Sequence, residues 1–125
     1  MARVLIIDDE YNIRLLYKEE FQDEGYDVAV AESADQAIPE IRKNKPDIVI
    51  LDINMPGTDG IEFMRWLKEE KSDIPVVICS AFGSYKRDFR IWVSDAYVVK
   101  SADLSELKNV TQNVLAGKSP GLVAV

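Results

Sequence analysis

The feature that constrains this chain most is a short apolar run that ends in an aspartate. Residues 48–51 read Ile-Val-Ile-Leu, Asp52 follows directly, and a loop containing proline and two glycines occupies 53–60. A continuous apolar run bounded by turn residues is typical of a strand buried on both faces of a parallel sheet. Asp52 is then at the carboxyl end of the strand, the edge where open α/β sheets bind their ligands.

Segments with strand and helix patterns alternate along the rest of the chain. Strands are expected at 3–9, 27–31, 48–51, 75–80 and 96–100, and helical segments at 10–24, from 33, at 61–71, at 85–93 and from 103. Such alternation implies right-handed crossovers and a parallel sheet covered by helices on both faces. We predict an α/β, flavodoxin-like (βα)5 three-layer sandwich with a parallel five-stranded sheet of order 2-1-3-4-5.

Three local signals refine this prediction. Ser33 followed by Gln36 predicts a capping box at the start of the second helix, and Asp103 followed by Glu106 predicts another at the last helix. Pro39 falls inside the second helix, where it removes a backbone hydrogen bond. We therefore expect that helix to be kinked or short.

Length, charge and cysteine content limit the function classes. The 125 residues suit one domain, expected at 1–117, with 118–125 as a C-terminal tail or linker. A net charge of −7 argues against direct nucleic-acid binding, and no apolar run approaches the roughly 20 residues that span a membrane. The single cysteine, Cys79, favours a reducing cytoplasm and is expected to be an inert packed thiol. The absence of histidine excludes histidine catalysis and histidine metal ligands.

Polar residues follow four of the five predicted strands. Asp8 and Asp9 end the first, Asp52 the third, Ser80 the fourth and Lys100 the fifth. Strand-end aspartates often only cap helices, but this topology brings three together at one edge. At roughly 5 Å they would repel by about 3 kcal/mol per pair at an effective dielectric of 20, which calls for a hard cation such as Mg²⁺ (or Mn²⁺). Metal, lysine and hydroxyl together would suit phosphoryl transfer to a carboxylate nucleophile.

With these motifs in order, the chain resembles the receiver domain of bacterial two-component response regulators from Arg3 to about Leu115. The motifs are the acidic pair at 8–9, the Leu-Asp-Ile-Asn-Met-Pro-Gly-Thr-Asp-Gly stretch at 51–60, Ser-Ala at 80–81 and Tyr-Val-Val-Lys at 97–100. One departure is Ser101, which stands where the family usually has a proline, often with a cis bond.

The resemblance implies a role for each matching residue. Asp52 would accept a phosphoryl group from the phosphohistidine of a sensor histidine kinase or phosphotransfer protein. Asp9, Asp52 and the backbone carbonyl of Asn54 would hold Mg²⁺, with Asp8 acting through water. The protein would be a signalling phosphoacceptor that assists its own phosphorylation and dephosphorylation, rather than an enzyme.

The remaining implied roles concern the switch and its partners. Lys100 would contact the phosphoryl oxygens, Ser80 would hydrogen-bond them after transfer, and Tyr97 would turn inward to fill the space that Ser80 leaves. The signal would pass to a downstream protein target or output domain. A homodimer could form through the face made by the predicted helix at 85–93, the strand at 96–100 and the last helix.

Three other function classes have discriminating features. A phosphorylation-independent pseudo-receiver, acting as an interaction module, would lack part of the acceptor set. A flavin-binding flavodoxin needs a loop rich in glycine, serine or threonine where this chain has Asp8-Asp9-Glu10, which would repel a phosphate. A Mg²⁺-dependent phosphohydrolase would need a second acidic residue at the position that Asn54 occupies here.

Overall fold

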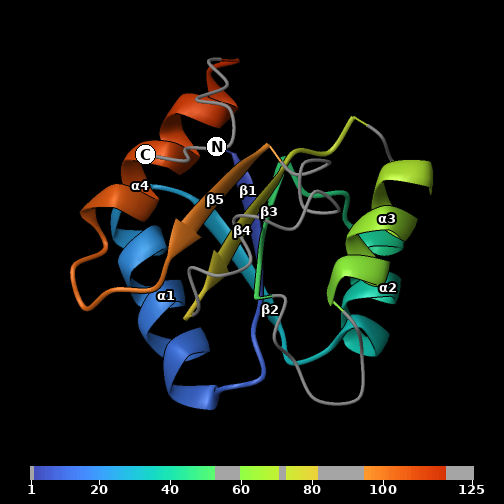
Figure 1. The fold of residues 1–125 in the computed structure, drawn as a ribbon, viewed down its shortest axis with the longest axis horizontal. Coiled ribbons are helices and arrows are strands. Elements are labelled where there is room, and N and C mark those ends of the chain that lie inside the picture. The colour runs from blue at the N-terminus through green and yellow to red at the C-terminus, as the bar shows by residue number, and fades with distance from the viewer. Residues whose placement is uncertain (1, 53–59, 71–72, 82–94, 118–125) are drawn as a thin grey trace.

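A single parallel sheet forms the centre of the fold in a computed structural model that describes residues 2–52, 60–70, 73–81 and 95–117 (Figure 1). Its strand order is β2-β1-β3-β4-β5, which confirms the predicted topology. The strands are β1 (Arg3–Ile7), β2 (Asp27–Ala31), β3 (Ile48–Leu51), β4 (Val76–Ser80) and β5 (Ala96–Val99). The first and last strands end earlier than predicted, before the polar residues that follow them.

Helices cover both faces of the sheet. They are α1 (Tyr11–Asp23), α2 (Ala34–Lys43), α3 (Gly60–Glu70) and α4 (Ser105–Leu115). Figure 1 shows α1 and α4 on one side and α2 and α3 on the other, which gives the three predicted layers. Among the described helices, none combines the length and apolar character needed to cross a membrane. The predicted helix at 85–93 and the predicted tail at 118–125 lie outside the described residues.

The central strand β3 is apolar throughout because both of its faces are buried. Ile48 and Ile50 belong to the core cluster under α1 and α4, whereas Val49 and Leu51 belong to the cluster under α2 and α3. Successive side chains of a strand point to opposite faces, so a strand covered on both sides needs an apolar residue at every position. This packing confirms the interpretation of the 48–51 run.

Strand register brings the carboxyl ends of β1 and β3 to the same level. Ile7 pairs with both Ala31 and Leu51. The ladder continues for one further step, because Asp8 N donates to Ala31 O at 3.1 Å and Asp52 N donates to Ile7 O at 3.0 Å. Asp8 and Asp52 therefore leave the sheet together.

The start of α2 follows its sequence signals in part. Ser33 Oγ accepts a hydrogen bond from Gln36 N at 3.3 Å, as predicted. The Gln36 side chain, however, accepts from Glu32 N at 3.0 Å rather than from Ser33 N. The helix continues through Pro39 and, at 10 residues, is the shortest of the four described helices.

The predicted capping box at the last helix is wrong. Helix α4 begins at Ser105, and Asp103 Oδ1 accepts from Ser105 N at 2.9 Å, only two residues ahead. This bond closes a local turn before the helix, a geometry that aspartate side chains favour. Glu106 therefore lies in the first turn of the helix, and Asp103, three residues before it, is not the N-cap.

Candidate functional site

Lys100 lies at the centre of a buried ion cluster at the carboxyl edge of the sheet. Its Nζ is 2.8 Å from Asp8 Oδ2 and 3.1 Å from Asp52 Oδ2. The two carboxylate residues are only 2% and 5% exposed. Burial disfavours the Lys100 ammonium, but the hydrogen bonds and charges of Asp8 and Asp52 outweigh it and raise the pKa of Lys100 above its usual value. The lysine is therefore charged at neutral pH and shared by both carboxylates.

The loop between β1 and α1 supplies a second group of carboxylates. One oxygen each from Asp8, Asp9 and Glu10 lies within 4.8 Å of the others. Asp8 is buried and its Oδ1 accepts from Glu10 N at 2.9 Å, while Asp9 and Glu10 are exposed. Hard oxygen ligands of this kind fit a small divalent cation that keeps several waters. Lys100 links Asp52 to this group, because its Nζ contacts both Asp8 Oδ2 and Asp52 Oδ2.

Ser80 and Tyr97 lie in the interior beside this cluster. Ser80 is fully buried at the end of β4, and its backbone oxygen accepts from Lys100 N at 2.7 Å. Tyr97 is 1% exposed and pairs with Ile78, two residues before Ser80. Because alternate residues of a strand share a face, both side chains point toward the layer formed by α2 and α3. The ring of Tyr97 is thus already inward, and its predicted movement on phosphorylation stays a prediction.

Two further expectations concern residues beside the cluster. Every peptide bond in the described part of the chain is trans, including the one between Lys100 and Ser101. Cys79 is a buried free thiol 3.7 Å from the hydroxyl of Tyr17, and burial raises its pKa to about 11. Burial also raises the pKa of Tyr17. A buried thiol of this pKa is protonated at neutral pH, in agreement with the predicted packed role.

Comparison with known proteins identifies the domain. The model of the response regulator receiver domain family matches residues 4–112. This chain belongs to that family. Sporulation initiation phosphotransferase F from Bacillus subtilis (strain 168) is 34% identical over 119 residues, covering 94% of this chain and 96% of that protein. PhoB, the phosphate regulon transcriptional regulatory protein of Pseudomonas aeruginosa, is 36% identical over 124 residues and 94% of this chain, which spans only 53% of PhoB.

Solved structures agree with this membership. TrrA, a response regulator protein from Thermotoga maritima solved in complex with Mg²⁺-BeF, is 40% identical to this receiver domain. Its TM-score is 0.88, over 91% of this chain and 99% of that chain. In a complex with histidine kinase ThkA, TrrA matches at 41% identity and a TM-score of 0.86, over 92% of this chain and 99% of that chain.

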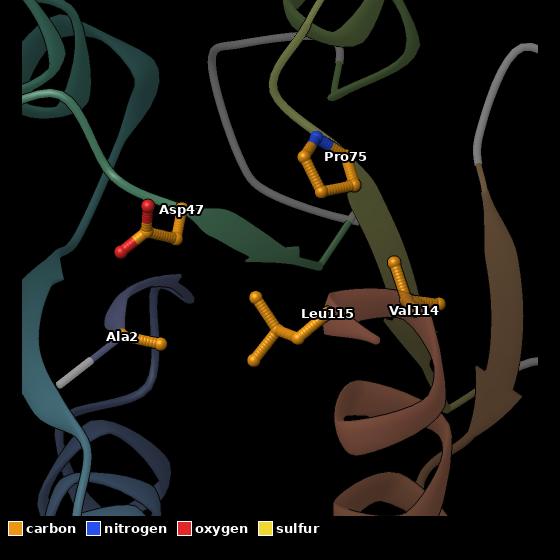
Figure 2. A pocket seen from close by; sticks show the side chains of 5 residues that line it. All are labelled: Ala2, Asp47, Pro75, Val114 and Leu115. Atoms are coloured by element: carbon orange, nitrogen blue, oxygen red, sulfur yellow. The ribbon is translucent and has the colours of Figure 1, made fainter. Parts of the chain in front are cut away.

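The opposite edge of this receiver domain has a hollow of different chemistry. The hollow has a volume of about 460 Å³. Figure 2 shows side chains that line it, those of Ala2, Asp47, Pro75, Val114 and Leu115. Asp47 is the one charged residue among the described residues of this lining, and its Oδ2 already accepts a hydrogen bond from Arg3 N at 2.7 Å. Among the described residues, the candidates for phosphoryl chemistry therefore lie at the other edge, with Lys100.

The structure places two further side chains beside the predicted site residues. The sequence predicts a helix start and phosphate repulsion for Glu10, whereas in the structure Glu10 completes the group of three carboxylates. The sequence motifs assign no role to Arg14, yet its Nη1 donates to Asp8 O at 2.7 Å. A basic residue one helical turn after an acidic run was the available signal for Arg14. The predicted metal ligand Asn54 lies outside the described residues.

Proposed function

We propose that this receiver domain accepts a phosphoryl group on Asp52, with Mg²⁺ bound beside it, and thereby switches the binding of a partner protein. The observation that carries the proposal is a buried carboxylate, 5% exposed, whose oxygen lies 3.1 Å from the Lys100 ammonium. In the reaction an oxygen of Asp52 attacks the phosphorus while the bond between phosphorus and the donor breaks. The TrrA complex with Mg²⁺-BeF supports this assignment.

The surrounding residues divide the remaining tasks. Asp9, Asp52 and the backbone carbonyl of Asn54 would hold Mg²⁺, with Asp8 acting through water, and the charge of the ion would offset that of the incoming phosphoryl oxygens. Lys100 would contact the same oxygens. Its ammonium is already fixed at the carboxyl edge, so little reorganisation is needed when negative charge arrives. Transfer and hydrolysis of the phosphoryl group would both use this arrangement, so the chain assists its own reactions without being a turnover enzyme.

A kinase docking surface lies next to the site on α1. Three large apolar side chains are exposed on this helix, those of Tyr11, Leu15 and Leu16, at 67%, 53% and 44%. Tyr11 directly follows the acidic loop, so a protein bound to this patch would hold its phosphohistidine near Asp52. We assign the patch to a sensor histidine kinase or phosphotransfer protein, supported by the complex of TrrA with histidine kinase ThkA.

We also propose further partners and a cellular location for this domain. A downstream protein target or output domain would read the phosphorylated state, and a homodimer would use the face that includes β5 and α4 together with residues 85–93. A cytoplasmic location fits the free buried thiol of Cys79. The domain is assigned to 1–117 and the tail or linker to 118–125.

The direct test of the acceptor is intact mass spectrometry after incubation with acetyl phosphate and Mg²⁺. Wild-type protein is expected to gain the mass of one phosphoryl group, and D52N none, because an amide cannot form the acyl phosphate. D47N is the matched control, since it makes the same change at the opposite edge and should be labelled normally. Equal labelling of D52N, or no labelling of wild type, would refute Asp52 as the acceptor.

Ser80→Ala is expected to separate phosphorylation from switching. The variant should gain phosphate to the same extent as wild type, because Asp52 and Lys100 are unchanged. It should lose the response at Tyr97, because the Ser80 hydroxyl that would bond the new oxygens is missing. Backbone amide chemical shifts of Tyr97 and Val98, measured before and after phosphorylation, provide the readout. Identical shift changes in both proteins would remove Ser80 from the switch.

A further inference from the structure

We propose that Arg14 is a positioning residue for the Mg²⁺ ligands, which it holds through the backbone of Asp8. Its Nη1 donates to Asp8 O at 2.7 Å, and its side chain is only 13% exposed. This inference rests on the proposed function, since it concerns the affinity for Mg²⁺ that phosphorylation requires.

Arg14 adds to the contacts that set the shape of the acidic loop, which include the bond from Asp8 N to Ala31 O and the pair of Lys100 with Asp8. Between the end of β1 and the start of α1, three residues must turn the chain and bring three carboxylates within 4.8 Å. The residue that precedes α1, Glu10, forms no side-chain cap on the helix. The bond from Glu10 N to Asp8 Oδ1 fixes one side of the turn. Arg14, from the second turn of α1, fixes the Asp8 carbonyl on the other side.

Arg14 is in turn held from two directions. Its Nη2 lies 3.8 Å from Glu32 Oε2, and its guanidinium carbon lies 5.8 Å from the centre of the Tyr11 ring. Glu32 directly follows β2 and is itself bonded by Gln36 Nε2 at 3.0 Å. The guanidinium therefore connects the loops at the ends of two neighbouring strands. Through this link β2 supports the site, although it places no ligand there.

The sign of the effect on Mg²⁺ affinity distinguishes positioning from charge. Arg14 brings a positive charge close to a cation site, so on electrostatic grounds alone its removal should tighten Mg²⁺ binding. If Arg14 instead orients the ligands, its removal should weaken binding, as loss of outer-shell partners does at metal sites. The two effects oppose each other, so the direction of the change identifies which one dominates.

The experiment is calorimetric titration of the full chain with MgCl₂, well below the melting temperature. Arg14→Gln is expected to raise the Mg²⁺ dissociation constant about tenfold. Arg14→Lys keeps the positive charge and a hydrogen-bond donor, so it should recover part of the lost affinity. Arg3→Gln is the matched control because it removes the same charge from the Arg3–Asp27 pair at the opposite edge, and it should bind like wild type.

The outcomes separate this inference from the proposed function. Wild-type protein that binds Mg²⁺, with Arg14→Gln binding equally or more tightly, would overturn the positioning role alone. Wild-type protein that does not bind Mg²⁺ would overturn the metal site and the inference with it. If Arg14→Gln does not fold by circular dichroism, Arg14→Lys decides: weaker binding at unchanged charge supports positioning, and wild-type affinity refutes it.

Discussion

Replacing Lys100 with methionine is expected to lower the free energy of unfolding by about 3–5 kcal/mol in metal-free buffer, because it removes one partner of a buried ion cluster. Asp8 and Asp52 would lose the ammonium that they share at 2.8 and 3.1 Å, while their mutual repulsion remains. For a domain of this size the loss corresponds to a fall of about 10–20 °C in the melting temperature. Thermal unfolding followed by circular dichroism measures it.

The matched control for this variant is Lys45→Met. Lys45 is also paired with an aspartate, Asp73, but the two side chains are 53% and 65% exposed. Exposed pairs contribute about 0–1 kcal/mol, so this variant should melt close to wild type. Equal melting of the two lysine variants would show that the Lys100 cluster contributes no more than a surface pair.

The pH dependence of the Lys100 effect has a definite sign. Burial opposes the charge, but hydrogen bonds and charges from Asp8 and Asp52 raise the pKa of Lys100 in the folded state. The stabilisation is therefore complete below the ordinary lysine pKa and is lost only as pH rises through the folded-state value. The difference in stability between wild type and Lys100→Met should stay constant from neutral to mildly alkaline pH.

Mg²⁺ is expected to raise the melting temperature of the wild-type protein. A ligand that binds only the folded state adds about 2.7 kcal/mol at a concentration 100 times its dissociation constant, which corresponds to about 5–10 °C here. The stabilisation arises because the carboxylates of Asp8, Asp9 and Glu10 repel one another when no cation is bound. Potassium chloride at matched ionic strength controls for screening, and Asp9→Asn should lose most of the rise. An unmoved melting curve would contradict the cation site.

Asp52→Asn supplies an internal comparison for this measurement. Removal of the Asp52 charge relieves its repulsion with Asp8, while the amide oxygen can still accept from Lys100. We therefore expect the metal-free variant to be more stable than wild type and to gain less from Mg²⁺.

The sequence was most informative where backbone geometry alone fixes position. Apolar residues at every position of 48–51 require a strand covered on both faces, and parallel strands share one edge, so Asp8, Asp52, Ser80 and Lys100 could be placed together. No knowledge of side-chain conformation was needed. The same reasoning placed Tyr97 on β5, where it is buried.

Prediction was weaker for polar side chains that have several possible hydrogen-bond partners. Arg14 can reach any oxygen within the span of its side chain, so sequence spacing does not select the Asp8 carbonyl. The Asp103 carboxylate accepts from Ser105 N rather than capping the helix, which begins at Ser105. The sharing of Lys100 by Asp8 and Asp52 likewise depends on how the strand ends are arranged in the folded sheet.

Because β1 and β3 end at the same level of the sheet, the site cannot tolerate deletions within these strands. Asp8 and Asp52 are each one residue past a hydrogen-bonded pair, Ile7 with Leu51, so their separation is set by how many residues each strand contains. Deleting a single residue from β3 would exchange its two faces and draw the acceptor carboxylate into the sheet. Loops can lengthen or shorten over evolutionary time, but the strands leading to this edge must keep their length, so we expect natural length variation in relatives to avoid them.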